Sequence, residues 1–174
     1  MGFRNSWVAS RAPLASLLAK AAWRESGKED DFLETGLYGL ELPGGWAMVI
    51  GAGWDHMDKV KPSLAVAAGD ALHLVQDDTS MIAVLSGFVD GQEQWSITYD
   101  GSDGVATPSF KGDVPPEAGA IWARCQAQQE AAGGKNAGVD YHYELVPELG
   151  LALTGFRHDQ DPPDGVMFRE LEEG

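Results

Sequence analysis

Residues 71–99, ALHLVQDDTSMIAVLSGFVDGQEQWSITY, decide the fold because they contain three consecutive β-type segments joined by short turns. Each segment is rich in β-branched, aromatic and other large apolar residues, which favour strands at this length. The last two segments are separated by the dipeptide Asp90-Gly91, which is typical of a two-residue β-hairpin turn. The three segments are 71–76, 80–89 and 92–99. We therefore predict an antiparallel meander over this stretch.

The Asp90-Gly91 turn also predicts which side chains of the meander share a face. A two-residue loop pairs Val89 with Gln92, and each further pair lies one residue farther along both strands. This register gathers a mainly apolar set of side chains, which we expect to face the core. The set comprises Ile82, Val84, Ser86, Phe88, Trp95, Ile97 and Tyr99, with Glu93 beside the turn. The opposite face is mixed, so it can be solvated or can lie under a partner.

The flanking segments predict an α+β domain built around this meander. A β-prone run at 6–10 and a hairpin over 36–51 would extend its sheet. Apolar side chains at helical spacing, with proline near the start or glycine near the end, predict four helices. They lie near 13–24, 62–68, 115–131 and 147–154. We expect an antiparallel sheet of about six strands, with these helices packed mainly on one face.

Four further segments complete the predicted order of elements. Residues 139–145 alternate apolar and polar side chains, as a half-buried strand would. Residues 166–171 predict a final strand at the edge of the sheet. Residues 27–31 and 54–61 are polar and predict loops.

The chain of 174 residues fits one domain, whose last part, 159–174, is predicted to be an acidic and partly mobile tail. No run approaches the roughly 20 apolar residues that cross a bilayer, and the N-terminus lacks the apolar stretch of a signal peptide. Cys125 is the single cysteine and cannot form an internal disulfide, which agrees with a reducing compartment. We therefore predict a cytoplasmic protein in which Cys125 is a buried thiol rather than a nucleophile.

The charge of the chain narrows the class of partner. The formal net charge of −15 argues against binding to nucleic acid or to an anionic membrane, because both need a positive surface. Between residues 62 and 110 there are seven acidic residues and not one Lys or Arg. This region is either a solvated, self-repelling surface or a surface for a basic protein. The mixed face of the meander leaves a homodimer as a further alternative.

Four carboxylates are predicted to meet at one end of the meander. The turn that holds Asp77 and Asp78 and the loop that holds Asp100 and Asp103 follow strands at the same end of the sheet. With no cation nearby in the sequence, the four would repel one another unless they were solvated, bound to a cation or paired with basic side chains. We take them as candidates for binding a partner or a cation, with solvation as the simpler alternative.

Arg157, His158 and Asp159 form the densest cluster of chemically useful side chains. They follow Gly155, which is the expected left-handed end of the 147–154 helix. In a functional interpretation, His158 is a general acid or base and Arg157 binds an anion. In a structural interpretation, which their adjacency favours, Arg157 and His158 satisfy the last helix carbonyls and Asp159 pairs with one of them.

Other titratable side chains give weaker signals. Asp55, His56 and Asp58 could hold a divalent metal, but no further ligands are identifiable, so we interpret them as a solvated loop and expect no metal. His73 and His142 stand alone on predicted strands and are expected to satisfy local hydrogen bonds. The sequence contains no phosphate loop, nucleophile elbow, dinucleotide fingerprint or zinc-protease signature, and we expect no cofactor.

Several motifs together resemble a family of uncharacterised bacterial proteins. They are SWVAS at 6–10, LPGGW at 42–46, DG at 90–91 with WSITYDG at 95–101, and VDYHYELVPELGLALTGFRHD at 139–159. The resemblance spans residues 6–159, and its last motif is the most specific. It implies a bacterial cytoplasmic protein without a known activity. It also marks Arg157, His158 and Asp159 as residues of interest.

Two functions remain open at this point. The first, which we favour, is a non-catalytic acidic binding or inhibitor protein of the immunity type, acting on a basic partner. The second is a small enzyme that uses His158, with Arg157 as its anion-binding group. A position of both side chains in the largest pocket would favour the enzyme, whereas burial of His158 away from a cleft would oppose it.

Overall fold

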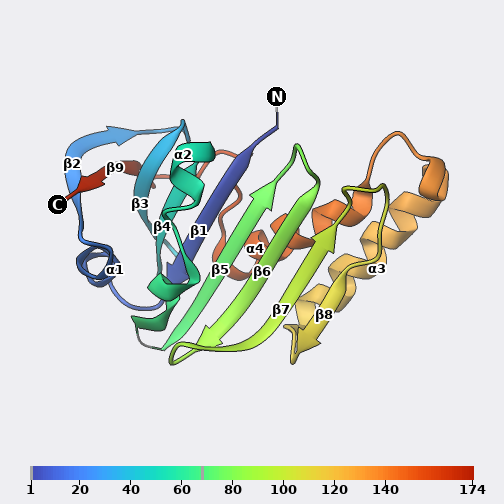
Figure 1. Cartoon of the computed structure of the whole chain (residues 1–174), viewed down its shortest axis with the longest axis horizontal. Helices are drawn as coiled ribbons and strands as arrows, with labels where there is room; N and C mark the ends of the chain where they lie inside the picture. Colours follow the sequence, from blue (N-terminus) through green and yellow to red (C-terminus); the bar gives the residue numbers. More distant parts are fainter. Residues whose placement is uncertain (1, 68) are drawn as a thin grey trace.

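The computed structural model describes residues 2–67 and 69–174, which form a nine-stranded antiparallel sheet with helices on its faces. The strand order is β2-β9-β3-β4-β1-β5-β6-β7-β8, so the first strand of the chain lies at the centre of the sheet (Figure 1). The strands are β1 (Arg4–Ser10), β2 (Trp23–Asp30), β3 (Gly36–Leu42), β4 (Trp46–Ala52), β5 (Asp70–Asp77), β6 (Ile82–Val89), β7 (Gln92–Asp100), β8 (Ser109–Gly112) and β9 (Phe168–Glu173).

The helices are divided between the two faces of the sheet, which corrects the prediction that they pack mainly on one face. In Figure 1, α3 and α4 lie behind the sheet, and the apolar side chains of α1, together with Leu64 of η1, pack on the opposite face. The helical segments are α1 (Leu14–Ala21), α2 (Trp54–Met57), η1 (Pro62–Ala67), α3 (Pro116–Ala131), η2 (Gly134–Asn136), η3 (Tyr141–Glu144) and α4 (Leu145–Thr154), with η marking 3-10 helices. Among the described residues, no helix combines the length and the apolar character needed to cross a membrane.

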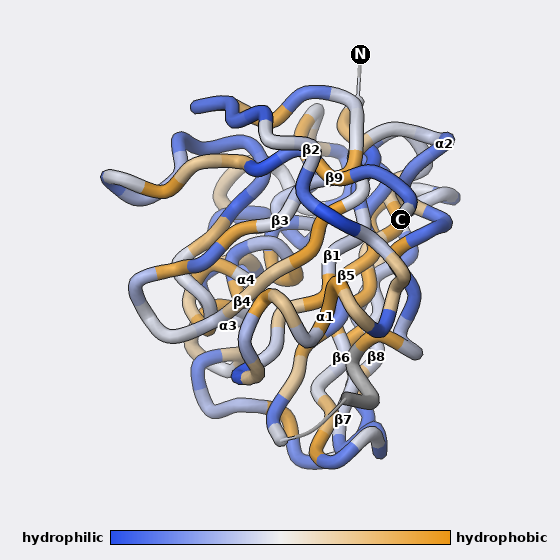
Figure 2. Tube along the Cα trace, turned by 90° about the vertical axis from the view of Figure 1, so that its left-hand side faces the viewer, coloured by the Kyte–Doolittle hydropathy of each residue, from blue (hydrophilic) through white to orange (hydrophobic). Residues whose placement is uncertain are grey.

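Two hydrophobic cores result, one on each face of the sheet. Neighbouring side chains of a strand point to opposite faces, so Trp7 packs in the core under α3 and α4 while Val8 packs in the core under α1. Because both faces are covered, residues 5–10 of β1 are all buried, including the polar ones. In Figure 2 the hydrophobic stretches gather in the middle of the molecule, whereas the outer loops are mostly hydrophilic.

The α+β class and the antiparallel sheet are confirmed, as are the meander and the 36–51 hairpin, and a helix lies at each of the four predicted positions. The helix predicted near 13–24 is shorter than expected, because it ends at Ala21 and residues 23–24 begin β2. The helix predicted at 62–68 is a 3-10 helix over Pro62–Ala67, and residue 68 lies outside the described residues. The helix near 147–154 begins two residues earlier, at Leu145, and Gly155 ends it in the left-handed conformation with φ of 79°. Cys125 is buried on α3, where burial raises the pKa of its thiol to about 11.

The sheet is larger than the sequence predicted because it contains two strands, β2 and β8, that were not predicted and whose side chains are mostly exposed. Residues 27–31 were expected to form a loop, yet 27–30 belong to β2, whose side chains are mostly exposed. Its pairing partner is β9, which was predicted as an edge strand but lies between β2 and β3. Residues 168–173, within the segment predicted as an acidic tail, therefore form an inner strand of the sheet. Residues 54–57, also predicted as a loop, form the one-turn helix α2.

The strand predicted at 139–145 is wrong, because these residues form η3 and begin α4. The carboxylate of Asp140 accepts a hydrogen bond from the backbone N–H of His142 and caps the 3-10 turn. The side chain of Gln129, on α3, accepts another from the N–H of Tyr141. These local partners replace the ladder of hydrogen bonds that a strand would need. The alternation of apolar and polar residues is thus compatible with a short turn in which Tyr143 faces the core.

The core face predicted for β6 is wrong because a β-bulge shifts the register next to the turn. Asp90 and Gly91 have positive φ values of 47° and 77°, as the predicted hairpin turn requires, and Phe88 pairs with Glu93 as expected. The next pair is Gly87 with Trp95, which leaves Gln94 as an extra residue. The shift brings Ala83 and Leu85, rather than Ile82 and Val84, to the face that carries Trp95, Ile97 and Tyr99.

Candidate functional site

The largest cleft of the described structure opens at the upper end of the sheet in the view of Figure 1. It has a volume of about 1070 Å³ and is lined by 2–4 at the start of β1, 33–35 before β3, 52–54 between β4 and α2, and 78–79 after β5. We call it the upper cleft. Segments that are distant in the sequence meet here because β1 lies between β4 and β5, and the β4–α2 and β5–β6 connections leave the same end of the sheet.

Aromatic side chains stand exposed around the upper cleft. Trp54 is 63% exposed and Phe3 is 43% exposed, and both line the cleft. Phe32 is 54% exposed and lies next to the lining residue Leu33. Large exposed aromatic residues are unusual on a surface that contacts only water and are enriched where proteins bind one another.

The charges around the cleft are mainly negative. Glu34 and Asp78 line it, and the exposed Asp55 follows Trp54 in α2. The one cationic side chain among its lining residues, Arg4, donates from Nε to the Asp77 carboxylate at 2.8 Å. Its guanidinium carbon also lies 3.3 Å from the centroid of the Trp54 ring. A cation would therefore meet an apolar surface bordered by carboxylates.

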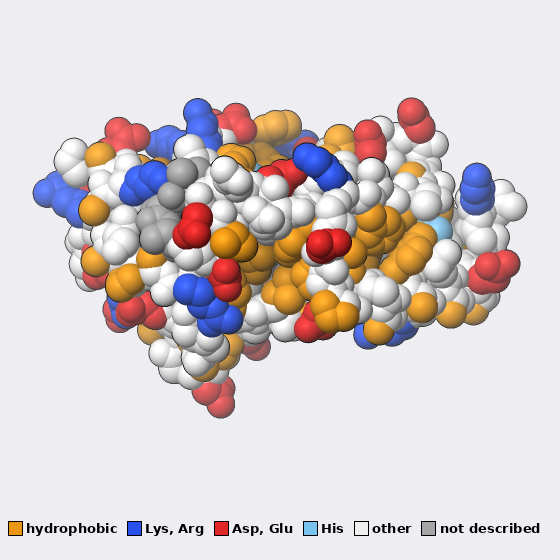
Figure 3. All heavy atoms as spheres, turned by 90° about the horizontal axis from the view of Figure 1, so that it is seen from below, with side chains coloured by type: hydrophobic (Ala, Val, Ile, Leu, Met, Phe, Trp, Pro, Cys, Tyr) orange, Lys and Arg blue, Asp and Glu red, His pale blue; other side chains and the backbone are white. Residues whose placement is uncertain are grey.

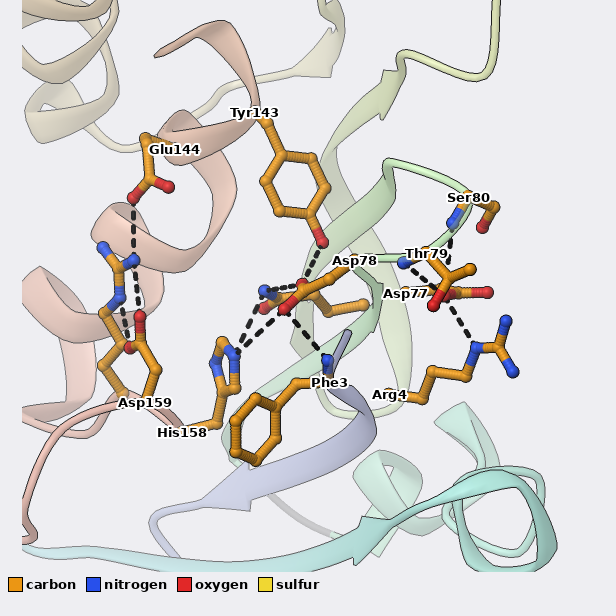
Figure 4. Close-up of polar contacts among 12 residues, drawn as sticks. Phe3, Arg4, Asp77, Asp78, Thr79, Ser80, Tyr143, Glu144, His158 and Asp159 are labelled. Carbon is orange, nitrogen blue, oxygen red and sulfur yellow. Dashed lines mark hydrogen bonds and ion pairs between the residues drawn. The ribbon is translucent and has the colours of Figure 1, made fainter. Parts of the chain in front are cut away.

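Asp78 joins the cleft to a buried polar cluster behind it (Figure 4). Its Oδ1 accepts hydrogen bonds from the Tyr143 hydroxyl at 2.6 Å and from the Gln76 amide at 2.8 Å. Its Oδ2 accepts one from the backbone N–H of Phe3 at 3.2 Å and lies 3.9 Å from His158 Nε2. These three donors and His158 come from four separate segments of the chain.

The donors keep Asp78 ionised. Burial by itself raises the pKa of its carboxyl, but His158, Tyr143 and Gln76 more than offset this and hold the pKa well below its usual range. Burial and the neighbouring Asp78 raise the pKa of the Tyr143 hydroxyl, so this group remains a donor. A general base that works at neutral pH needs a pKa near 7. Asp78 is therefore suited to hold a fixed negative charge on the cleft wall and poorly suited to accept a proton.

His158 lies behind the upper cleft and does not line it. Its side chain is 4% exposed, and the ring packs edge-on against Phe3 with centroids 5.1 Å apart. Figure 4 shows His158 and Phe3 side by side beneath Asp78. A substrate in the cleft would be separated from the imidazole by Phe3 and Asp78.

Arg157 points away from His158, as adjacent residues on an extended segment do. Its guanidinium binds both oxygens of Asp159, at 2.6 and 2.9 Å, and also contacts Glu144 at 2.7 Å and Glu148 at 3.6 Å. Burial lowers the pKa of Arg157, but these carboxylates more than offset it and raise the pKa above its usual value. The predicted pair of Arg157 with Asp159 is thus present, and an incoming anion would have to displace three carboxylates.

The role predicted for Arg157 and His158 at the helix end is wrong. Their side chains bind carboxylates and an amide rather than the last carbonyls of α4. Carbonyls in the last turn of α4 find local donors instead, because the Gly155 N–H donates to the Leu151 carbonyl and the Thr154 hydroxyl donates to the Gly150 carbonyl. Arg157 instead reaches back to the first turn of the same helix.

The four predicted carboxylates do lie at one end of the sheet, but they do not form one site. Asp77 pairs with Arg4, a cation that β1 brings from a distant part of the chain. Hydrogen bonds from Arg4 and the following turn offset burial, which alone would raise the pKa of Asp77, and lower it. Asp78 belongs to the buried cluster, whereas Asp100 accepts hydrogen bonds from Ser102 and Asp103 is exposed.

The remaining histidines have different surroundings. Asp55 and His56 lie on α2 with Asp58 at its end, and no group of three or more His, Cys, Asp or Glu in residues 2–67 and 69–174 is arranged to hold a metal ion. His73 is buried between the Ser6 hydroxyl and the Val60 carbonyl, as expected for a local hydrogen-bonding role. Burial lowers the pKa of His73 to about 4, although the bond to Val60 acts in the opposite direction. His142 Nδ1 lies 2.7 Å from the Ala106 carbonyl oxygen.

Apart from Asp78 and His158, the residues that build the upper cleft and the cluster behind it were not identified from the sequence. Asn5 is fully buried, and its amide nitrogen and oxygen have no hydrogen-bond partner among the described residues. It pairs in register with Gln76, whose Oε1 is also without a partner there. The segment NSWVAS at 5–10 places polar residues within an apolar strand, and this pattern could have indicated a buried polar cluster. The partners of these residues were not predictable, because they depend on which strand lies next to β1. Trp54 lay in a segment predicted as a loop and carried no pattern.

A second concave surface lies at the opposite end of the sheet. Figure 3 shows this end from below, with hydrophobic side chains gathered along a hollow. The groove has a volume of about 250 Å³, and Trp46, Leu72, Trp95 and Leu153 are among its lining residues. Asp70 is the one charged side chain among the lining residues that the structure describes. We call it the lower groove.

Comparison with known proteins gives no match, whether with protein-family models, with curated proteins or with solved structures. The functional interpretation therefore depends on the geometry of the two ends of the sheet.

Proposed function

We propose that this chain is a non-catalytic binding protein, of the inhibitor or immunity type, that binds a basic protein through the upper cleft. The observation that carries the proposal is the combination of exposed Trp54 and Phe3 in the largest cleft with a border of carboxylates. Aromatic side chains supply much of the affinity of protein interfaces, and complementary charge at the rim selects the partner. We place the protein in the cytoplasm, as its sequence predicts.

Two features support a binding role over the alternative of an enzyme that uses His158 and Arg157. The His158 side chain is nearly inaccessible from the cleft, and the Arg157 guanidinium is already paired with carboxylates. The ionised Asp78 adds a permanent negative charge to the cleft wall, which attracts a cation without any proton transfer.

A net charge of −15 attracts any basic protein at low salt, so the test must separate local from overall charge. We would measure the affinity for cytochrome c, a small basic protein, by isothermal titration calorimetry. The double variant Glu34→Gln/Asp55→Asn neutralises one carboxylate that lines the cleft and one that follows the lining residue Trp54. The control Asp161→Asn/Asp164→Asn neutralises two exposed carboxylates of the loop before β9 and makes the same change in net charge.

We expect the cleft variant to weaken binding about five-fold or more and the control about two-fold or less, because close charge pairs contribute more than distant ones. Chemical shifts of backbone amides should change mainly at 2–4, 33–35 and 53–55. Equal weakening by the two double variants, with shifts spread over the surface, would rule out a specific docking site at the cleft.

A further inference from the structure

We infer that the upper cleft selects an arginine side chain of its partner, which stacks on the part of the Trp54 indole that remains open. The inference rests on the proposed function and names the chemical group that the cleft recognises. The cleft then prefers arginine to lysine, although lysine carries the same charge on a compact ammonium group.

The first support is the state of the Trp54 ring. The Arg4 guanidinium carbon lies 3.3 Å from the ring centroid and so covers part of one face of the indole. The Trp54 residue nevertheless remains 63% exposed. The pairing of an arginine with a tryptophan face is among the most favourable cation–π contacts in proteins. The contact with Arg4 is therefore an example, within the chain, of the interaction that this ring makes.

The second support is that Arg4 is held firmly and its charge is balanced. Its Nε donates to Asp77 Oδ1 at 2.8 Å, and both side chains are only 16% exposed. The Asp77 carboxylate is fixed in turn by backbone N–H groups of Thr79 and Ser80, at 2.9 and 3.3 Å. A second cation that approached Trp54 would therefore not meet an uncompensated positive charge. Arg4 acts as a positioning residue that holds the indole in place before the partner arrives.

The third support is that one acidic residue lines the cleft and another is the neighbour of Trp54 in the sequence. Glu34 lines the same cleft, and Asp55 is the next residue after Trp54 on α2. Both are exposed and have no ion-pair partner among the described residues. An arginine fork can stack on an indole and bind a carboxylate with two parallel hydrogen bonds at the same time, whereas a lysine ammonium does neither as well.

The test compares a tetra-arginine peptide with a tetralysine peptide, which have equal charge, by isothermal titration calorimetry at low salt. We expect wild type to bind the arginine peptide roughly five-fold more tightly, because stacking on an exposed aromatic ring has a value of about 1 kcal/mol. Trp54→Leu should bring the two affinities together while changing the tetralysine affinity less than about two-fold. Trp54→Phe should keep part of the preference, since a smaller ring attracts a cation less strongly.

Phe32→Leu is the matched control, because it removes another exposed aromatic ring of the same end and should leave the preference unchanged. Equal affinities in wild type, or a preference that survives Trp54→Leu, would overturn the inference. If Glu34→Gln/Asp55→Asn still weakens cytochrome c binding in that case, the proposed function stands and only the arginine selectivity fails. If the cleft charges have no local effect at all, the proposed function itself fails.

Discussion

The upper cleft and the lower groove lie at opposite ends of the same sheet, and different interactions stabilise them. The lower groove is lined mainly by apolar side chains such as Trp46 and Trp95, which pack in the core behind it. The upper cleft contains the half-buried carboxylate of Asp78, which is stable only because separate segments supply donors to it. The upper end therefore depends on hydrogen-bond donors from separate segments as well as on packing. Such an arrangement is typical of a surface with a function.

The largest expected effect is the loss of Asp78. Asp78→Ala would leave the Tyr143 hydroxyl, the Gln76 amide and the Phe3 N–H without their acceptor, and should lower the free energy of unfolding by about 3 kcal/mol. Urea unfolding followed by circular dichroism measures the change. Asp103→Ala, at the same end but exposed, should leave the midpoint unchanged. Equal effects of the two substitutions would show that the upper end does not depend on this carboxylate.

Acid titration distinguishes the effect of Asp78 at the upper cleft on stability from that of the buried His73, because the two groups titrate in different pH ranges. The pKa of His73 falls from 6.5 to about 4 on folding, because burial favours the neutral imidazole. The free energy of unfolding should therefore be highest above pH 6.5 and should decrease as the pH falls from 6.5 to about 4. The loss should reach roughly 2–3 kcal/mol. The pKa of Asp78 lies below its ordinary 3.8, so its contribution is present above about pH 4 and is lost only below it.

Urea unfolding at pH 7, 5.5, 4.5 and 3.5 tests both windows. His73→Asn should remove the dependence between pH 6.5 and 4, and Asp78→Asn should remove part of the dependence below it. Equal stability of wild type at pH 7 and pH 4.5 would contradict the assignment to His73.

At the lower groove, the sharpest test is the contact of Gly87 with Trp95. A Cβ atom at Gly87 would lie 2.2 Å from Trp95 Nε1, so Gly87→Ala forces the indole to move. We expect a loss of about 2 kcal/mol in the free energy of unfolding. Gly119→Ala on the exposed side of α3 has open space and should instead stabilise the chain by about 0.5–1 kcal/mol. A Gly87→Ala protein as stable as wild type would mean that the indole packs loosely there.

The smallest expected effect is a gain of stability at the upper end. Asn5 is fully buried without hydrogen-bond partners among the described residues, so Asn5→Leu, of similar size, should raise the free energy of unfolding by about 1 kcal/mol. The same urea titration measures it, with Ala9→Val in the same strand as a control for overpacking. A loss of stability in Asn5→Leu would indicate that the amide has a partner, such as a bound water.

Much of the fold was predictable because its signals are local. The Asp90-Gly91 turn, the α3 helix and the Gly155 stop depend on residues within a few positions of one another. The bulge at Gln94 was not predictable from the hairpin. The neighbouring strand β8 approaches it closely, because a Cβ atom at Gly112 would lie only 2.0 Å from the Gln94 carbonyl oxygen. A register that depends on the next strand cannot be read from the hairpin alone.

The candidate site was predictable only in part, for a related reason. The acidic turn at Asp77 and Asp78 was recognised, and so was the polar cluster at Arg157 and His158. That Arg4 would neutralise Asp77 was not visible, because the two residues are 73 positions apart and meet only when β1 pairs with β5.

By itself, the sequence determined the class of the domain, the meander with its turn, the main helices and the acidic character of the surface, because these depend on composition and on near neighbours. The tertiary structure alone decided which side chains surround the carboxylates at the upper end of the sheet. Tyr143 and His158 reach Asp78 across 65 and 80 residues of chain, and Trp54 meets Arg4 because β1 lies beside β4 and β5. Such contacts form between strands and helices whose order in space no local pattern records, and the binding role that we propose for the upper cleft depends on them.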